Sequence, residues 1–369
     1  MSEIEANTGL VGFSVKQACD LLGITENYIR RMEDEFGFTV DRALRGTVMN
    51  RVYTTEKIFE IQHLRRERGQ LAGLRKPITL SVYVKKGGSA KTSVACNLAV
   101  HLQLRGLRVC IIDNDPQGDA TSMLGYDPDR TPEELIEEGF SPDLAVKGHF
   151  GNLLVPSSGR FQQLNLEEII KKPYGEYGPH LIPAEESIED LGPALSAQMH
   201  SDLRYGLFIE KSRKGLYQHC DLSKYDVIIF DNNPAGTPLS RNALVASDML
   251  VCPIRFDKFS FRALTRLSEW LQEFEDTTGR CPELVAVPTM YVRNRPVMQR
   301  KLAQVQEKFP DNVVAEQLHH SADYLKSLDD NVLLAFYQSK TPANSTQAMR
   351  EVCLEIYERI VRISEAKEK

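Results

Sequence analysis

Residues 85–93 read Lys-Lys-Gly-Gly-Ser-Ala-Lys-Thr-Ser and lie between two apolar segments. Residues 78–84 have the length and composition of a buried strand, and residues 94–102 have those of a helix. A strand, a glycine turn and a helix start gather backbone N–H groups and the positive end of the helix dipole around one point, which favours phosphate binding. The alternative is an ordinary glycine turn with surface lysines. We expect a nucleotide site formed by Lys86, Gly87, Gly88, Ser89, Ala90, Lys91, Thr92 and Ser93.

This loop departs from the common phosphate-binding pattern, in which glycine stands at both ends of a four-residue spacer. Lys85 and Ala90 occupy those two positions, and Lys86 adds a second lysine on the N-terminal side. Lys91 would reach the β- and γ-phosphates, and the Thr92 hydroxyl would take Mg²⁺. The loop resembles the deviant Walker A loop of the ParA/MinD group of dimeric ATPases. Its Lys-Thr-Ser ending after a non-glycine residue resembles the large, plasmid-type ParA partition proteins in particular.

Length and composition are those of a globular protein with two or three domains. The 369 residues are 42% hydrophobic and 26% charged, with a net charge of −6 that argues against uniform coating of nucleic acid. The seven cysteines form no C-x-x-C pair and indicate reduced, mostly buried thiols. The N-terminus is polar and acidic, and no run approaches 18 apolar residues. We therefore expect a soluble, cytoplasmic protein without a membrane anchor.

The first 76 residues are expected to form a separate DNA-binding domain. Ser14 and Gln17 form a capping box, the first helix ends at Gly23, and Thr25 caps a second helix that runs toward Phe36. Two helices joined by a tight turn indicate a helix-turn-helix, with the second helix as the candidate major-groove reader. Its outward positions are Asn27, Arg30 and Arg31.

The residues after this pair resemble the rest of a MerR-type winged helix. Arg42, Arg45 and Arg51 surround Gly46 in a predicted wing hairpin, and Thr54 or Thr55 would cap a third helix. Residues 30–76 hold eleven Lys/Arg against seven Asp/Glu, so this part is locally basic within an acidic chain. A small helical dimerisation appendage is the alternative. The predicted domains are residues 1–76 and residues 77–369.

The second domain is predicted to be an α/β P-loop NTPase with a mostly parallel sheet covered by helices on both faces. Apolar runs of strand length alternate with amphipathic stretches, which is typical of such sheets. The predicted strands are 78–84, 108–112, 181–183, 226–230, 248–254 and 284–287. Residues 128–223 resemble an elaboration of this domain, and the tail from Met349 to Ile363 keeps helical spacing with alternating charge, unlike a membrane helix.

Two acidic motifs follow predicted strands, where open α/β sheets bind ligands. Asp113 and Asp115 end one strand, and either carboxylate could position a metal or a water molecule. The motif resembles D-x-D-P-Q-G of ParA proteins, and the resemblance implies that Asp115 acts on the attacking water and contributes to the Mg²⁺ site. Asp231 ends a Walker B-type strand and would hold Mg²⁺, whereas Asp226 lies at the wrong end of that strand. Asn232-Asn233-Pro234 replaces the two prolines usual in the family.

A further segment, residues 288–295, resembles the family's P-T-x-x-D-x-R stretch near the nucleotide base. The resemblance implies base contacts by Met290, Tyr291 and Arg293, although Val292 replaces the usual acidic residue. Basic residues gather here without an acidic neighbour, and related ATPases bind non-specific DNA with such residues. A solvated helix face is the alternative. The candidate DNA contacts are Arg293, Arg295, Arg300 and Lys301, with Lys340 nearer the C-terminus.

The resemblance implies a DNA-segregation ATPase that dimerises with ATP and Mg²⁺. Lys86 would cross to the partner subunit's phosphates, as an arginine finger does. It also implies stimulation by a ParB-type centromere-binding protein, non-specific binding to the nucleoid, and repression of the partition operon by the winged helix. The alternatives are a nucleotide-sensing transcriptional repressor and a MinD-like ATPase that positions a membrane or protein cargo. A reductase-type iron–sulfur ATPase would need paired cluster cysteines, which this sequence lacks.

Overall fold

The computed structural model describes residues 12–45, 48–154, 161–256, 260–337 and 344–366. For residues 45, 48, 260–263, 325, 328 and 344 it describes the backbone alone. The predicted DNA contact Lys340 and the side chain of Arg45 therefore lie outside the described part of the chain.

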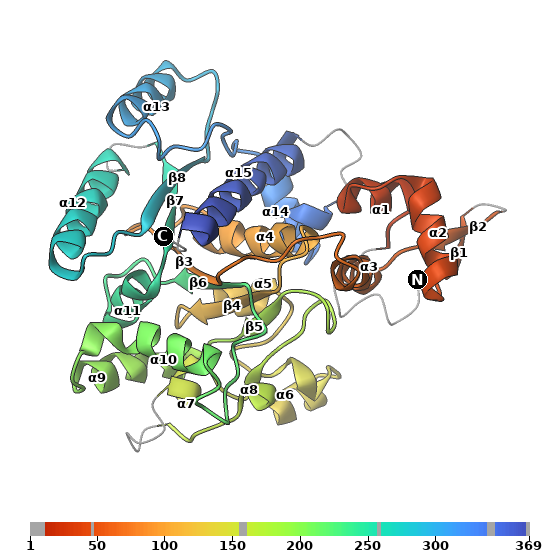
Figure 1. The fold of residues 1–369 in the computed structure, drawn as a ribbon, viewed down its shortest axis with the longest axis horizontal. Coiled ribbons are helices and arrows are strands. Elements are labelled where there is room, and N and C mark those ends of the chain that lie inside the picture. Colours follow the sequence, from red (N-terminus) through yellow and green to blue (C-terminus); the bar gives the residue numbers. More distant parts are fainter. Residues whose placement is uncertain (1–11, 46–47, 155–160, 257–259, 338–343, 367–369) are drawn as a thin grey trace.

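A six-stranded parallel sheet forms the centre of the molecule, as the sequence predicts (Figure 1). The strand order is β5-β4-β6-β3-β7-β8, and every neighbouring pair is parallel. The strands span β3 (Ile78–Val82), β4 (Val109–Asn114), β5 (His180–Ile182), β6 (Val227–Asn232), β7 (Met249–Arg255) and β8 (Glu283–Thr289). All six predicted strands are confirmed, with ends that differ by no more than a few residues.

Helices cover both faces of this sheet because successive side chains of a strand point to opposite faces. Ile111 and Ile229 pack into one buried cluster with α4 (Lys91–Leu104) and α15 (Asn344–Ala366), whereas Ile112 and Ile228 pack into a second cluster with residues of the middle stretch. That second layer contains α7 (Phe150–Leu154), α8 (Leu166–Ile169), α9 (Leu191–Ser196), α10 (Arg204–Arg213) and α11 (Pro238–Ala246). Residues 128–223 thus contribute to the same core as the sheet.

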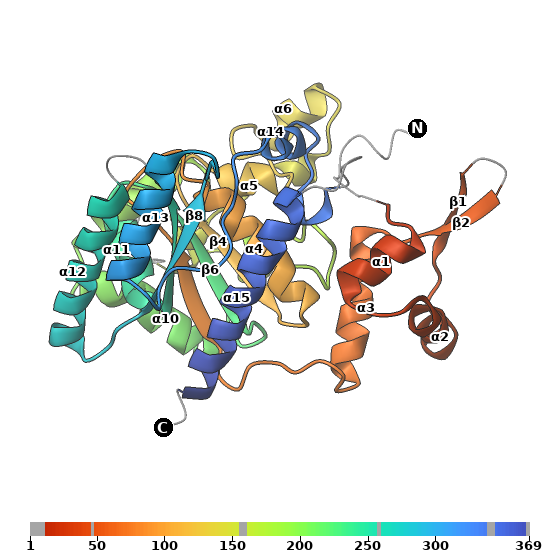
Figure 2. The ribbon, with the colours of Figure 1, turned by 90° about the horizontal axis from the view of Figure 1, so that it is seen from above.

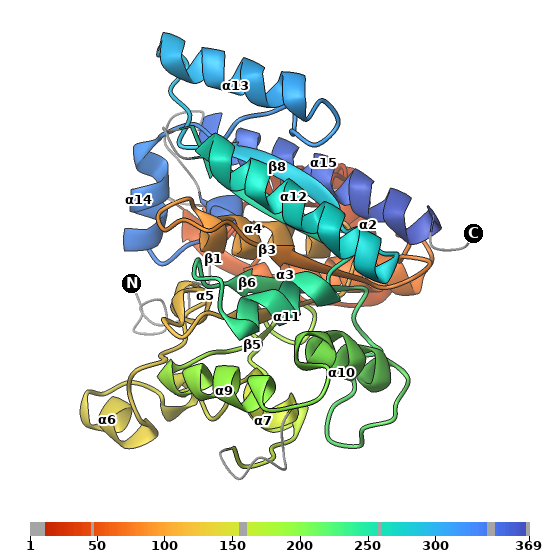
Figure 3. The same ribbon diagram turned by 90° about the vertical axis from the view of Figure 1, so that its left-hand side faces the viewer.

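The remaining elements complete the body of the protein. They are α5 (Asp119–Met123), α6 (Pro132–Glu137), α12 (Ser260–Thr278), α13 (Pro296–Lys308) and α14 (Ala322–Asp329), with 3-10 turns at Pro142–Leu144, Glu186–Asp190, Ser201–Leu203 and Leu334–Phe336. Figure 3 shows α12 beside β8 and α13 farther out. Among the described residues, no helix combines the length and apolarity that a membrane span requires.

The N-terminal elements follow the predicted order of two helices, a hairpin and a third helix. They are α1 (Val15–Leu22), α2 (Glu26–Phe36), the antiparallel pair β1 (Asp41–Arg45) and β2 (Val48–Val52), and α3 (Thr55–Glu67). Ser14 forms the predicted capping box, Thr25 caps α2, and Thr54, the first of the two candidates, caps α3.

The predicted DNA-reading side chains have ion-pair partners of their own. Asn27 is exposed, and so are Arg30 and Arg31. Arg30 pairs with Glu26 and Arg31 with Glu35, each one helical turn away, whereas Arg51 of β2 pairs with Glu33 of α2 at 3.0 Å. The DNA-binding role of these residues stays a prediction.

The N-terminal elements lie at one side of the body (Figure 2), and aromatic side chains pack between the two. Phe13 and Phe59 of the N-terminal segment meet Tyr174 and Phe336 of the body, with ring centroids 5.8 to 6.0 Å apart. These rings belong to one continuous buried cluster that also contains β3, α4 and α15. Residues on both sides of the predicted domain boundary thus share a hydrophobic core.

Polar contacts hold the same junction. Arg66 of α3 binds Asp226 with both terminal nitrogens, and Asp226 also accepts a hydrogen bond from the Arg108 backbone N–H at 2.6 Å. The Gln62 side chain donates to the Leu104 carbonyl at the end of α4. Asp226, which the sequence analysis set aside as a metal ligand, is thus the acidic anchor of the N-terminal elements.

Replacing Arg66 by alanine should lower the free energy of unfolding by about 2–3 kcal/mol, because it leaves the mostly buried Asp226 carboxylate without its bidentate partner. Urea unfolding followed by circular dichroism measures this change. Lys214→Ala is the matched control, since Lys214 and Glu210 form an exposed pair on α10 whose loss should cost less than about 0.5 kcal/mol. Equal effects of the two substitutions would contradict the anchoring role.

Candidate nucleotide-binding site

The loop at residues 85–90 turns the chain from β3 into α4 through two left-handed residues. Gly88 has φ +65°, which glycine adopts readily. Ala90 also has φ 65°, at the position where the common pattern has glycine, and Lys91 begins α4 directly after it. Because Ala90 provides no side-chain cap, the first N–H groups of α4 are not capped by this residue and can bind an anion.

Lys91 lies inside the site rather than on the surface. Its side chain is buried, and Nζ donates to the Lys86 carbonyl at 3.2 Å. Burial lowers the pKa of Lys91, whereas the nearby carboxylates of Asp231, Asp115 and Asp119 raise it. The ammonium group is therefore held among acidic groups at the start of α4.

Asp231 is a buried carboxylate with little hydrogen-bonding support among the described residues. It ends β6 beside Val82 of β3 and Asp113 of β4. Neither of its carboxylate oxygens has a hydrogen bond of standard geometry to a described residue. Burial and then the negative charge of Asp113 raise its pKa well above the ordinary value, and the Thr92 side chain and Lys91 offset part of this rise. A bound cation would compensate such a carboxylate.

The donor set around Asp231 suits Mg²⁺. This ion binds through one or two carboxylates and keeps water and substrate phosphates as its other ligands. Asp231 and the Thr92 hydroxyl supply that kind of partial shell. The described residues contain no group of three or more His, Cys, Asp or Glu side chains that could form a complete protein cage.

The sequence analysis allowed either Asp113 or Asp115 to position a metal or a water molecule. The two carboxylates have different surroundings in the structure. Asp113 is fully buried and accepts hydrogen bonds from the Thr121 N–H at 2.9 Å and hydroxyl at 2.7 Å, and from the Asp115 N–H at 3.2 Å. Burial raises the pKa of Asp113 to about 7 despite these bonds. Asp113 thus fixes the turn, and Asp115 is left to face the loop and Lys91.

The two asparagines after Asp231 hold this region together, a role that the sequence did not reveal. The Asn233 amide donates to Asp115 Oδ1 at 3.1 Å, and its Oδ1 accepts from the Ala235 N–H at 2.7 Å. The Asn114 amide donates to the Asn232 side chain at 2.8 Å, and the Tyr205 hydroxyl donates to Asn114 at 2.9 Å. The only sequence signal for this role was the pair of asparagines directly after Asp231.

The segment predicted to lie near the nucleotide base contacts the phosphate loop. The Thr289 hydroxyl donates to the Ser89 carbonyl at 3.2 Å, across 200 residues of sequence. Met290 has φ 51°, uncommon for a non-glycine residue, and Tyr291 is buried between Phe256 and His319. Base contacts by Met290, Tyr291 and Arg293 stay a prediction.

Basic side chains connect the loop to α13. Burial lowers the pKa of Lys86, and the positive charges of Arg255 and Lys301 lower it further. Arg255, at the end of β7, is a basic residue that the sequence analysis missed. Arg293, Arg295 and Arg300 are exposed at the start of α13, and Lys301 is half-buried. Four of the five predicted DNA contacts in the C-terminal half therefore lie together on one element and the segment before it.

The left-handed backbone of the loop can be tested by opposite substitutions at Gly88 and Ala90. Gly88→Ala should lower the free energy of unfolding by about 1–2 kcal/mol, because a Cβ there meets no atom within 4 Å and adds only left-handed strain. Ala90→Gly should raise it by up to about 1 kcal/mol, since it removes such strain at some cost in chain entropy. Thermal and urea unfolding measure the free energy of unfolding of each variant. If the two substitutions change it in the same direction, the left-handed conformations of Gly88 and Ala90 are contradicted.

Comparisons with known proteins agree with this geometry. The sequence is 25% identical over 370 residues to protein SopA of Escherichia coli K12, covering 94% of this chain and 88% of SopA. It is 27% identical over 230 residues to the chromosome-partitioning ATPase Soj of Thermus thermophilus, covering 62% of this chain and 76% of Soj. The fold is similar to that of cobyrinic acid a,c-diamide synthase from Mycobacterium smegmatis with bound ADP and magnesium. That match has a TM-score of 0.56 at 20% identity and covers 77% of this chain and 95% of the synthase.

A family model described as an AAA domain matches residues 78–282, which is more than half of the chain. The matched region begins at β3, includes the phosphate loop and both acidic motifs, and ends before β8. The chain therefore belongs to the AAA-domain family, as a P-loop ATPase of the ParA/Soj type.

Proposed function

We propose that this protein is an ATP-dependent DNA partition protein that dimerises on binding ATP. The observation that carries the proposal is the convergence of Lys91, Asp115 and the buried Asp231 at a loop with a second lysine, Lys86. Lys91 would bind the β- and γ-phosphates, and Thr92 and Asp231 would hold Mg²⁺. The ADP and magnesium in the structurally similar synthase support this choice of ligands.

Hydrolysis of ATP needs a water molecule held in line with the γ-phosphate. Mg²⁺, when bound, supplies charge that stabilises the phosphate oxygens. Asp115 would orient the water, since Asp113 is occupied by the turn that it anchors. Asn233 would keep Asp115 in place through its amide. The proposed activity is a weak basal ATPase.

Dimerisation would complete the site. Lys86 lies at the edge of the loop among basic residues, and its own carbonyl receives Lys91. An ammonium group surrounded by Arg255 and Lys301 would be stabilised by additional negative charge. We propose that Lys86 reaches the phosphates bound by the partner subunit, so that ATP joins the two copies.

DNA would be bound in two ways. The basic residues at the start of α13 would contact phosphates of any sequence when ATP is bound. The N-terminal elements, with α2 as the reading helix, would bind an operator and repress the partition operon. A ParB-type centromere-binding partner would stimulate hydrolysis and release the DNA. The partition function named for Soj supports this assignment.

Two other functions make different predictions. A nucleotide-sensing repressor would bind an operator but would show no ATP-dependent binding to random DNA. A cargo-positioning ATPase would hydrolyse ATP without DNA, so that substitutions at α13 would leave its behaviour unchanged.

ATP-dependent binding to random duplex DNA, measured across a salt series, tests the proposed function. Each phosphate contact contributes about 0.9 to the slope of log K against log salt, so substituting Arg293, Arg295 and Arg300 together by glutamine should reduce the slope by about 2–3. Lys91→Ala should abolish the ATP dependence because it removes the phosphate ligand. Arg280→Gln, an exposed arginine on the loop before β8, is the control and should keep the wild-type slope. DNA binding that does not depend on ATP, or a salt slope that is unchanged in the triple variant, would refute the proposal.

Asn233→Ala should lower kcat by about tenfold and change the affinity for ATP by less than about twofold, because a misplaced Asp115 affects water orientation rather than nucleotide binding. Steady-state ATP hydrolysis gives kcat, and equilibrium binding of a fluorescent ATP analogue gives the affinity.

Asn233→Asp is the isosteric control for that experiment. It replaces the amide donor by a second carboxylate and should lower kcat at least as far as the alanine variant. Wild-type kcat in either variant would remove Asn233 from the site.

A further inference from the structure

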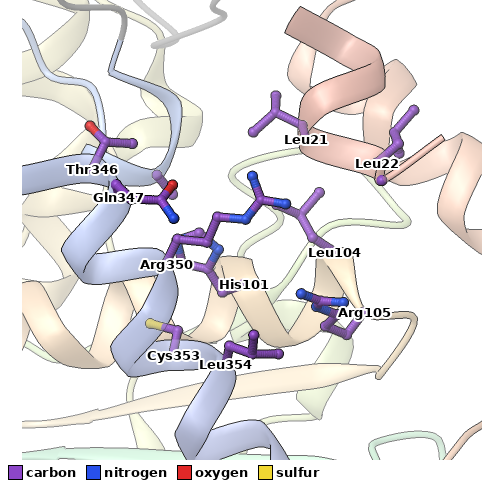
Figure 4. A pocket seen from close by; sticks show the side chains of 12 residues that line it. Leu21, Leu22, His101, Leu104, Arg105, Thr346, Gln347, Arg350, Cys353 and Leu354 are labelled. Carbon is purple, nitrogen blue, oxygen red and sulfur yellow. The ribbon is translucent and has the colours of Figure 1, made fainter. Parts of the chain in front are cut away.

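A cavity of about 120 Å³ lies where three helices meet at the N-terminal junction (Figure 4). α1 contributes its last residues, α4 its C-terminal end and α15 its first turns. We propose that this cavity binds a small oxyanion of the size and charge of phosphate. The residues that line it are Leu21, Leu22, Gly23, His101, Leu104, Arg105, Ala335, Thr346, Gln347, Arg350, Cys353 and Leu354.

Two arginines line this cavity, and none of the described residues that line it is acidic. The positive charges of Arg105 and Arg350 both lower the pKa of His101. Neither arginine has an ion pair to the described part of the chain. Both arginines are exposed, and their positive charges would attract an anion to the cavity.

Two neutral polar atoms at the same place also need a partner. His101 Nε2 and Thr346 Oγ1 are buried and make no hydrogen bond to a described residue. Burial together with the two arginines lowers the pKa of His101 to about 3, so its imidazole is neutral and can donate from one nitrogen. Figure 4 shows the Arg350 side chain extending past His101 toward Leu104.

The chemistry of these groups selects the ligand. Guanidinium groups bind the oxygens of phosphate and carboxylate with parallel hydrogen bonds, and imidazole and hydroxyl groups donate to the remaining oxygens. Cavities for drug-sized molecules have volumes of about 300–1,000 Å³, so this one fits a small ion rather than a nucleotide. The phosphate could be free in solution or could belong to the backbone of bound DNA.

The site is independent of the phosphate loop. α4 joins the two, with Lys91 at its first residue and His101 near its last turn, roughly 15 Å along the axis. An anion in the cavity would connect α1 of the N-terminal elements with α4 and α15 of the body. The inference does not rest on the proposed partition function, since it uses none of the residues placed there.

Equilibrium dialysis of radiolabelled inorganic phosphate against the full-length protein, at constant ionic strength, tests the proposal. The double variant Arg105→Gln/Arg350→Gln should lose at least about tenfold in affinity, because each lost charge-assisted bond weakens the complex. Lys91→Ala should leave this binding in place and remove only phosphate held by the loop. Arg362→Gln, an exposed arginine farther along α15, is the matched control and should bind as the wild type does.

Random duplex DNA in a parallel assay distinguishes the two sources of phosphate. A double variant that loses DNA affinity but shows no change with free phosphate assigns the cavity to the DNA backbone, and the reverse assigns it to a free ion. If the double variant matches the wild type in both assays, the cavity is not an oxyanion site. Equal melting temperatures of the variants would show that the fold is intact.

Discussion

The buried pair of carboxylates on β4 and β6 sets the main constraint on this structure. Asp113 and Asp231 stand opposite each other in the register of the two strands, both removed from water. Two buried like charges at this separation are costly, so each needs compensation. Asp113 receives it from the Thr121 side chain and from two backbone N–H groups. Among the described residues, the Thr92 side chain and the positive charge of Lys91 stabilise the Asp231 carboxylate, which leaves it suited to a cation brought by a substrate.

Hydrogen bonds from asparagine side chains hold the loop after β6, where the resemblance leads one to expect a pair of prolines. Proline fixes the backbone through its ring, whereas asparagine can fix it through hydrogen bonds. Asn233 ties its own loop to Ala235 and at the same time holds Asp115. Ser240 adds a hydrogen bond to the Asn233 carbonyl at 3.2 Å. The side chains therefore combine loop rigidity with placement of an acidic group.

Local signals predicted much of the fold, and long-range contacts escaped prediction. The capping residues Ser14 and Thr25, the six strands and the phosphate loop depend on neighbours in sequence, and the structure has them where the pattern indicated. Arg66 and Asp226 are 160 residues apart, and Asn233 and Asp115 are 118 apart, so periodicity held no information about either pair. The sequence did not distinguish Thr54 from Thr55 as the N-cap of α3. In the structure, Thr54 is the cap because its hydroxyl accepts a hydrogen bond from the Lys57 N–H.

The contacts that fix α3 on the body would constrain how two copies of this protein bind DNA under the proposed function. Because Arg66, Gln62 and the aromatic cluster fix the N-terminal elements, α2 is held at one orientation to the sheet rather than carried on a loose tether. In a two-fold pair of these chains, the distance between the two copies of α2 would be set by the dimer axis. If α2 reads the major groove as proposed, its two copies would contact half-sites about 34–36 Å apart or a multiple of that distance, as dimeric helix-turn-helix proteins do. A palindromic target of this protein would therefore tolerate changes in the sequence of its spacer far better than changes in its length.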